Sequence, residues 1–264
     1  MDLKLTGKLA VITGSTAGIG RAIAETLAAQ GAKVIINGRT QDKVERVAQE
    51  ISAQGQAFGV AADLSSAEGV RQLVEGAQKI GPIDILVNNY GIFEPKSFEE
   101  VTDDDWLRFF NLNVLSAIRC SRAVMGGMRA RGWGRILFVS SESGINIPAE
   151  MVHYGMTKTA LLSVRRGLAK VLAGSSVTVN ALLPGPTWIE GVSEFIGKLA
   201  RERNQTMEAY QEAFFETARP GSLIKRFASP EEVAFLAACL CSPRAGAITG
   251  SAHLVDGGIV DTCF

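Results

Sequence analysis

The sequence predicts an α/β fold, with one doubly wound parallel sheet of about seven strands and helices on both of its faces. Short apolar runs rich in β-branched residues alternate with longer segments in which apolar residues recur at helical spacing, as at Ile23 and Leu27. The short runs are almost continuously apolar, which is typical of strands covered on both faces. Strand, helix and strand repeated in this order favour a parallel sheet with right-handed crossovers.

One domain is expected to contain all of residues 1–264. The chain has no linker rich in proline or serine and no internal repeat, and its length suits one large α/β domain. Its 47% hydrophobic and 20% charged residues are ordinary for a soluble globular protein. Lysine plus arginine equals aspartate plus glutamate, at 27 each, which argues against a nucleic-acid surface and against electrostatic docking on an anionic membrane.

Seven apolar runs account for the predicted strands. In chain order they are Leu9–Thr13, Lys33–Asn37, Ala57–Ala61, Ile83–Asn88, Arg135–Ser140, Val177–Leu182 and His253–Val255. The connection after the sixth run is unusually long. It holds two helical patterns, Ile189–Arg203 and Thr206–Ala218, before the next helix begins at Pro230. A long connection at the carboxyl edge of a parallel sheet is usually functional, so we expect residues 188–225 to form a lid over the substrate.

The apolar side chains of this predicted lid allow two interpretations. They belong either to an inner face that packs onto the sheet edge or to a hydrophobic substrate chamber, and the pattern alone does not decide. The set comprises Phe195, Ile196, Leu199, Met207, Tyr210, Phe214 and Phe215.

A glycine-rich segment opens the first helix directly after the first strand. It reads Thr13-Gly14-Ser15-Thr16-Ala17-Gly18-Ile19-Gly20. Glycines placed in this way allow a tight turn, a close approach of the backbone to a pyrophosphate and close packing of helix on strand. The first turn of the helix offers free N–H groups and the positive end of the helix dipole. The segment therefore predicts a Rossmann-type dinucleotide site contacted by Gly14, Ser15, Thr16, Gly18, Ile19 and Gly20.

The end of the second strand indicates which nicotinamide cofactor binds. An acidic residue there accepts hydrogen bonds from a ribose 2′-hydroxyl, whereas an arginine accommodates a 2′-phosphate. The chain has Asn37-Gly38-Arg39-Thr40 and no carboxylate at this place. The sequence thus favours NADP(H) over NAD(H), with Arg39 at the phosphate. The alternative is that Arg39 is an ordinary solvated residue on a loop.

Asp63 and its neighbour Leu64, which follow the third strand, are predicted at the adenine end of the cofactor. The Asp63 carboxylate suits the adenine amino group. It would equally serve as the N-cap of a helix beginning at Ser65, and the two roles are compatible.

Tyr154 and Lys158 are the strongest candidates for chemistry. They are four residues apart, so both side chains leave the same face of a helix. A phenol with a reference pKa near ~10 is a poor acid or base at neutral pH, but a neighbouring ammonium lowers that pKa and makes proton transfer possible. Ser141 lies at the end of the fifth predicted strand, where its hydroxyl would hold the oxygen that gains or loses the proton.

Two other polar residues are harder to interpret. Asn113 falls inside a helical pattern, where asparagine is disfavoured because its side chain competes for backbone partners. On physics alone, its role is open between function and chance. His153 precedes the tyrosine, but successive helix residues point about 100° apart, so we expect it to flank the pocket rather than to act as a base.

Together these segments resemble the short-chain dehydrogenase/reductase family along essentially the whole chain. The matching elements, in order, are the Thr13–Gly20 loop, Asn88-Asn89-Tyr90-Gly91, Asn113, Ser141, the Tyr154/Lys158 pair, Pro184-Gly185 with Thr187, and Asp256-Gly257-Gly258. The resemblance, to 3-oxoacyl-[acyl-carrier-protein] reductase-like members among others, implies an NAD(P)-dependent carbonyl reductase or alcohol dehydrogenase.

The resemblance also implies roles for individual residues. Tyr154 would be the acid/base, and Lys158 would bind the nicotinamide ribose and lower the tyrosine pKa. Ser141 would hold the substrate oxygen, and Asn113 would keep a water in a proton relay through Lys158. Cofactor contacts are implied for Asn89, Gly91, Tyr154, Lys158, Pro184, Gly185 and Thr187. A homo-oligomer, either a tetramer or a dimer, is implied as well.

One position departs from the family pattern. The family usually has alanine in the Asn-Asn-Ala-Gly turn, and this chain has Tyr90. A bulky ring beside the cofactor groove would reshape the approach of either the adenosine or the substrate.

Specificity is expected to depend on Glu142, Met151 and Trp188, which fall with Ser141 and Tyr154 where the substrate cavity should be. A 3-oxoacyl thioester or another apolar ketone, a steroid-like ketone, a sugar and a small diketone would all suit the catalytic set. Two other functions stay open. One is a non-catalytic protein that senses nicotinamide dinucleotides, and the other is an epimerase or dehydratase on the same scaffold.

The cysteines and histidines argue against a metal site. The four cysteines show no C-x-x-C spacing, and there are only two histidines. Reduced thiols favour a cytoplasmic location. The first residues lack an apolar targeting region, and no run approaches the length of a membrane span.

Overall fold

All seven predicted strands are present in one parallel sheet with the order β3-β2-β1-β4-β5-β6-β7. The computed structural model describes residues 2–203 and 205–263. The strands are β1 Leu9–Ile12, β2 Lys33–Gly38, β3 Gln56–Ala61, β4 Ile85–Asn88, β5 Gly134–Val139, β6 Val177–Pro184 and β7 Ala252–Val255. Their ends lie within one residue of the predicted runs, except that β4 begins two residues later and β6 ends two residues later than predicted.

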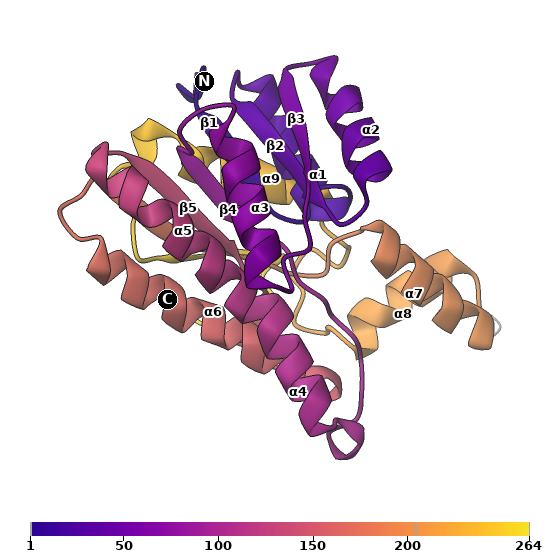
Figure 1. The fold of residues 1–264 in the computed structure, drawn as a ribbon. Coiled ribbons are helices and arrows are strands. Elements are labelled where there is room, and N and C mark those ends of the chain that lie inside the picture. The colour runs from indigo at the N-terminus through magenta and orange to yellow at the C-terminus, as the bar shows by residue number, and fades with distance from the viewer. Residues whose placement is uncertain (1, 204, 264) are drawn as a thin grey trace.

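Helices cover both faces of this sheet (Figure 1). They are α1 Gly18–Ala29, α2 Gln41–Ser52, α3 Ala67–Gln78, α4 Asp103–Phe110, α5 Ser116–Ala130, α6 Val152–Val171, α7 Glu190–Glu202, α8 Met207–Thr217 and α9 Pro230–Cys241. Helices α1, α2 and α9 pack on one face, and α3, α5 and α6 pack on the other. The doubly wound arrangement predicted from the sequence is therefore confirmed.

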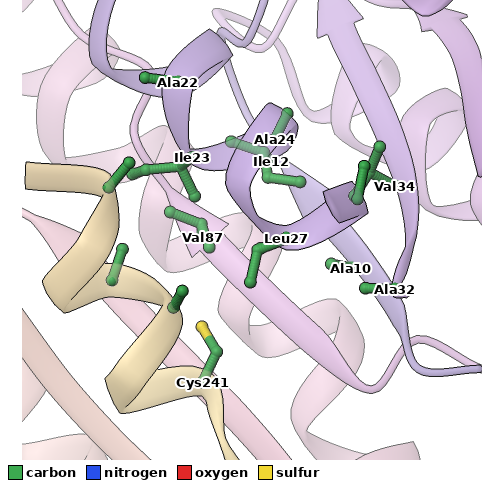
Figure 2. Packing of buried hydrophobic residues seen from close by; sticks show 14 of the residues in the cluster. Ala10, Ile12, Ala22, Ile23, Ala24, Leu27, Ala32, Val34, Val87 and Cys241 are labelled. Atoms are coloured by element: carbon green, nitrogen blue, oxygen red, sulfur yellow. The ribbon is translucent and has the colours of Figure 1, made fainter. Parts of the chain in front are cut away.

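Each face has its own apolar core. On the first face, Ile23 and Leu27 of α1 are fully buried among side chains of α9 and the central strands (Figure 2). Burial of one such side chain stabilises a fold by about 1.5–3 kcal/mol. Strands β1, β4, β5 and β6 are buried along their whole length. The edge strands β3 and β7 are partly exposed, so the expectation of cover on both faces holds for the inner strands only.

The order of the strands opens a crevice at one point of the sheet edge. The chain runs outward from β1 through β2 to β3, and then returns to β4, which pairs with the other side of β1. Connections at the carboxyl ends of β1 and β4 therefore leave in opposite directions, and ligands bind open α/β sheets at such a switch point.

Side chains cap the N-termini of α3, α4, α8 and α9. Ser66 caps α3 by accepting a hydrogen bond from the Gly69 N–H, at 3.0 Å. The alternative role of Asp63 as the N-cap is therefore wrong. Asp63 instead accepts a hydrogen bond from the Ser65 N–H, at 3.0 Å, and closes the turn before the cap.

Residues 188–225, called the α7–α8 segment from here on, extend from the sheet edge as a pair of helices (Figure 1). They have a small core of their own, in which Ile196, Tyr210 and Phe215 are buried with Phe227. Most of the predicted apolar set thus packs between the two helices rather than onto the sheet. The side chain of Phe195 lies outside the described residues.

No helix in the described ranges has the length and hydropathy that are needed to cross a membrane.

Candidate active site

The glycine-rich loop is built around close approaches of its backbone. Gly14 and Gly18 have φ angles of 62° and 56°, a left-handed conformation that favours glycine. A Cβ atom at Gly20 would lie 2.4 Å from Asn89 Nδ2 and 2.5 Å from the Gly14 carbonyl oxygen. Asn89 Nδ2 donates to the carbonyl oxygens of Thr13 and Gly14, each at 3.0 Å. The residue after β4 therefore fixes the loop after β1.

The N-terminus of α1 is left without a cap. Ala17 occupies the N-cap position, no side chain accepts a hydrogen bond there, and the first turn holds no acidic residue. Ala17, Gly18, Ile19 and Gly20 all line the cavity that also holds Tyr154 and is described below. Open N–H groups at a positive dipole end fit the pyrophosphate of a dinucleotide cofactor, so these residues would hold that part of it.

Ser15 does not lie where the predicted cofactor contact would need it. Its hydroxyl donates to the Ile12 carbonyl oxygen at 2.7 Å and accepts from the Asn37 N–H at 2.9 Å, and its own N–H donates to the Asn37 carbonyl oxygen. The residue is fully buried. Both polar groups of Ser15 are therefore engaged within the protein, and its role is to join the loop to β2.

The predicted adenosine end lies outside the cavity and is open to solvent. Arg39 and Asp63 are exposed, and Leu64 is buried with the core under the sheet. Thr16 packs close to Gly38, at the end of β2. Tyr90 is half-buried, and burial raises its pKa; Asp63 raises it further and Arg39 opposes this. The charges of both residues thus act on the Tyr90 phenol, so this departure from the family pattern lies near the predicted adenosine end.

Tyr154, Lys158 and Ser141 line one cavity of about 440 Å³. Tyr154 and Lys158 come from α6, and Ser141 follows β5. The Ser141 hydroxyl accepts from the Ser143 N–H at 3.1 Å and donates to the Pro184 carbonyl oxygen at 3.5 Å. Lys158 Nζ donates to the Val139 carbonyl oxygen at 3.1 Å and lies 5.4 Å from the centre of the Tyr154 ring. The sheet edge thus brings together the three residues predicted for proton transfer.

Burial controls the ionisation of this group. It raises the pKa of Tyr154 to about 12; the hydrogen bond with Ser141 lowers the pKa, and the charge of Glu142 raises it. Burial also lowers the pKa of Lys158 to about 8. Burial therefore dominates the pKa of both groups, and the lowering of the tyrosine pKa by Lys158 remains a prediction.

Asn113 lies in a π-helical turn, Asn111–Leu115, which explains why it looked out of place in a regular helix. Its Oδ1 accepts from the Ile92 N–H at 2.7 Å, and its Nδ2 donates to the Ile92 carbonyl oxygen at 2.9 Å and to Thr157 Oγ1 at 3.0 Å. Both donors are engaged, so the side chain ties the loop after β4 to α6. A relay through a water held at Asn113 remains a prediction.

His153 does not flank the cavity, contrary to expectation. It is buried on another side of α6, with its ring centre 4.3 Å from that of Phe109 and 6.2 Å from that of Trp106. Its place in this aromatic group leaves it no part in proton transfer at Tyr154.

The remaining predicted cofactor contacts lie at or just after the ends of β4 and β6. Pro184, Gly185, Thr187, Asn89 and Gly91 line the cavity. A Cβ atom at Gly185 would lie 2.7 Å from Asp256 Cα. The Asp256 carboxylate in turn accepts from the N–H groups of Gly258 and Val260. The Asp-Gly-Gly motif therefore shapes the turn after β7 that packs against Gly185.

The substrate side of the cavity differs in part from the prediction. Glu142 and Met151 line it, but Trp188 does not, because its ring packs on Phe227 at 5.1 Å between centres. Ile189 and Val192 form the wall there instead.

Glu150 and Arg219 also line the cavity, and the sequence did not predict either of them as a site residue. Arg219 Nε lies 3.5 Å from Glu142 Oε1, and Arg219 Nη1 lies 3.2 Å from Glu150 Oε1. No local pattern distinguishes these residues from other surface charges.

Among the described residues, no group of three or more histidine, cysteine and acidic side chains could hold a metal ion. The cysteines are all free thiols.

Comparisons with known proteins show that the chain is similar to a wide set of oxidoreductases. A family model described as short chain dehydrogenase matches residues 8–195. The uncharacterized oxidoreductase YvrD of Bacillus subtilis is 46% identical over 260 residues, covering 98% of this chain and 99% of the relative. The 3-oxoacyl-[acyl-carrier-protein] reductase FabG of Aquifex aeolicus is 37% identical, covering 98% of this chain and 100% of the relative.

A solved structure has nearly the same fold. The L-sorbose reductase of Gluconobacter frateurii, determined with NADPH and L-sorbose, is 35% identical and has a TM-score of 0.94. The similarity covers 99% of this chain and 100% of that one. The comparison extends over the glycine-rich loop, the candidate catalytic residues and the α7–α8 segment alike.

Proposed function

This chain belongs to the short-chain dehydrogenase/reductase family and is an NAD(P)-dependent oxidoreductase, and we propose that it interconverts a ketone and a secondary alcohol with NADP(H). One observation carries the proposal. Tyr154, Ser141 and Lys158 line the same cavity as the uncapped N-terminus of α1. A cofactor whose phosphates lie at that helix end has its other half beside the proton donor.

The residues of the chain supply position and a proton. A bound nicotinamide provides or takes up the hydride. Ser141 holds the carbonyl oxygen, and Tyr154 donates the proton to it as negative charge develops. Because its pKa is about 12, Tyr154 is neutral, and so able to donate, at any pH near neutrality. Lys158 keeps a positive charge near the phenol below about pH 8.

The preference for NADP(H) is part of the proposal. Family membership leaves either dinucleotide open. Arg39 follows β2, is exposed, and forms no ion pair with any acidic group in the described part of the chain. A guanidinium that is free in this place suits a 2′-phosphate.

The α7–α8 segment is proposed to act as the substrate lid. Its residues Val192, Ile196 and Phe214 form one wall of the cavity, while its own small core keeps the two helices together. Such a segment can move as a unit and exclude water from the reacting groups.

Self-association and location complete the proposal. Leu107 and Phe110 of α4 are 67% and 40% exposed, which suits an interface between copies of the chain, either in a dimer or in a tetramer. Free thiols suit the cytoplasm. Molar mass measured by light scattering would test the oligomer, and a monomeric mass would contradict it.

A carbonyl panel tests the reaction. Purified protein with NADPH is mixed with ketones of several classes, and the loss of NADPH absorbance is followed. Turnover with at least one ketone supports an oxidoreductase. Tight NADPH binding without turnover on any ketone or secondary alcohol would instead favour a dinucleotide sensor.

A further inference from the structure

Glu142 is a buried carboxylate with an unsatisfied oxygen in the substrate part of the cavity. Glu142 is only 3% exposed, and it lines the cavity. Its Oε2 atom is buried and has no hydrogen-bond partner among the described residues. Buried polar atoms in native structures almost always have a partner, so an unpartnered carboxylate oxygen on a residue that lines a binding cavity indicates a missing donor.

Arg219 holds the other oxygen of this carboxylate. Its Nε lies 3.5 Å from Glu142 Oε1, and its Nη1 lies 3.2 Å from Glu150 Oε1 and 2.8 Å from the Ala218 carbonyl oxygen. Its side chain is 13% exposed, above the ring of Phe214. Arg219 belongs to the α7–α8 segment, whereas Glu142 follows β5. The segment therefore orients Glu142 and leaves Oε2 for a ligand.

Glu142 lies next to the reacting groups. It follows Ser141 directly, and its negative charge acts on the Tyr154 phenol. A substrate whose carbonyl oxygen lies between Ser141 and Tyr154 therefore has its neighbouring carbons within the part of the cavity that Glu142 lines. A hydroxyl on that carbon has the donor that Oε2 lacks.

The charges around Glu142 argue against a carboxylate substrate, and its unpartnered oxygen argues against an apolar ketone. Glu142 and Glu150 together outnumber the one guanidinium of Arg219, and Asp256 adds a further negative charge that acts on Glu142. This excess disfavours a carboxylate substrate. An apolar ketone would leave Oε2 without a donor, and a buried polar atom with no partner carries a free-energy cost.

We infer that the substrate is a neutral α-hydroxy ketone, or the corresponding vicinal diol in the reverse direction, whose hydroxyl donates to Glu142 Oε2. The inference rests on the proposed function. In reduction, the carbonyl carbon gains a hydride from NADPH and the carbonyl oxygen gains a proton from Tyr154. The products are the diol and NADP⁺, and the recognised hydroxyl is unchanged. The apolar ketone expected from the family resemblance is replaced by this class.

Two small ketones of nearly equal size test this assignment. Hydroxyacetone carries the hydroxyl, and butan-2-one has a methyl group in its place. The wild-type protein should reduce hydroxyacetone with a kcat/KM at least about 100-fold higher, because a site built to bind a hydroxyl rejects an analogue without it. In Glu142→Leu the ratio of the two kcat/KM values should fall to below about 5. Glu142→Gln, which keeps an acceptor oxygen, should retain an intermediate ratio.

A matched control and a second variant keep the test decisive. Glu208 is exposed on α8 of the same segment, and Glu208→Leu should leave the ratio at its wild-type value. Arg219→Leu frees Glu142 without removing it and should lower the ratio even where Glu142→Leu fails to fold, which a thermal melt would show.

The outcomes separate the two proposals. Faster reduction of butan-2-one or of 3-oxobutanoate than of hydroxyacetone would overturn the inference and leave the proposed function standing. An unchanged ratio in folded Glu142→Leu, or in Arg219→Leu, would do the same. If no ketone is reduced at all, the proposed function itself fails.

Discussion

The cofactor end and the substrate end of this cavity are built in different ways. At the cofactor end, the loop from Thr13 to Gly20 relies on backbone: glycines with positive φ, hydrogen bonds to carbonyl oxygens, and a helix terminus without a cap. At the substrate end, side chains from separate segments meet, with Glu142 after β5 and Arg219 after α8. A site made of backbone tolerates few residue types, so its sequence pattern is readable, whereas a site made of side chains can change with each substitution.

The helix ends show the same contrast. Helix α9 begins with a capping box, in which Ser229 accepts from the Glu232 N–H and Glu232 accepts from the Ser229 N–H. Helix α1 begins with Ala17 and no acidic residue. The capped N-terminus of α9 stabilises the fold by itself, whereas the N-terminus of α1 keeps its N–H donors open for a ligand.

Among the substitutions at the cofactor end, Gly20→Ala should have the largest effect, because it disrupts the glycine-rich loop. The new Cβ would lie 2.4 Å from Asn89 Nδ2, so the loop must shift, and a displacement of about 1 Å can cost about 100-fold in activity. NADPH titration by fluorescence should show a loss of affinity of similar size. Gly126→Ala on α5, where a Cβ meets nothing within 4 Å, is the matched control and should bind normally.

The pH dependence sharpens the account of the substrate end. Oxidation of an alcohol needs the Tyr154 anion, and because the pKa of Tyr154 is about 12, the anion fraction rises about tenfold per pH unit below that value. The oxidation rate should therefore still be rising at pH 9. Reduction needs the neutral phenol and should decline above about pH 8, where Lys158 loses its proton. An oxidation rate that is already level at pH 7 would show that Lys158 does lower the tyrosine pKa.

Arg39→Asp tests the one part of the cofactor end that relies on a side chain. Loss of a charge-assisted hydrogen bond, with repulsion added, should weaken NADPH binding by about 10–100-fold. NADH binding should change little, since it has no 2′-phosphate. Dissociation constants for both nucleotides would check this, and an equal loss for the two would contradict the assignment of NADP(H).

Removing the cap of α9 and adding one to α1 should give the smallest effects, and the two variants should differ in whether stability or NADPH affinity changes. Ser229→Ala should lower the free energy of unfolding by about 1 kcal/mol without changing cofactor affinity. Ala17→Asp, which places a capping carboxylate at the open end, should weaken NADPH binding and leave the protein without ligand at least as stable. Thermal melts with and without NADPH measure both. Equal NADPH affinity in Ala17→Asp and wild type would argue against phosphate at α1.

The sequence predicted the cofactor end more completely than the substrate end. Strand periodicity located all seven strands, and the spacing of Tyr154 and Lys158 placed both in one cavity. Ser15 was misplaced, because the orientation of a loop hydroxyl depends on Asn37 in another strand. The contact of Trp188 with substrate was expected, but its ring is held by Phe227. Arg219 could not be found, since its meeting with Glu142 depends on the packing of α7 and α8.

The most direct test of the account is the Tyr154→Phe variant, with turnover and cofactor affinity measured on the same preparation. The cavity joins a backbone-built cofactor end to a side chain, Tyr154, that is proposed to donate the proton. The account predicts that kcat for ketone reduction falls by about 10²–10⁴-fold while the NADPH dissociation constant changes less than about threefold. A variant that keeps near wild-type kcat would contradict proton transfer by Tyr154.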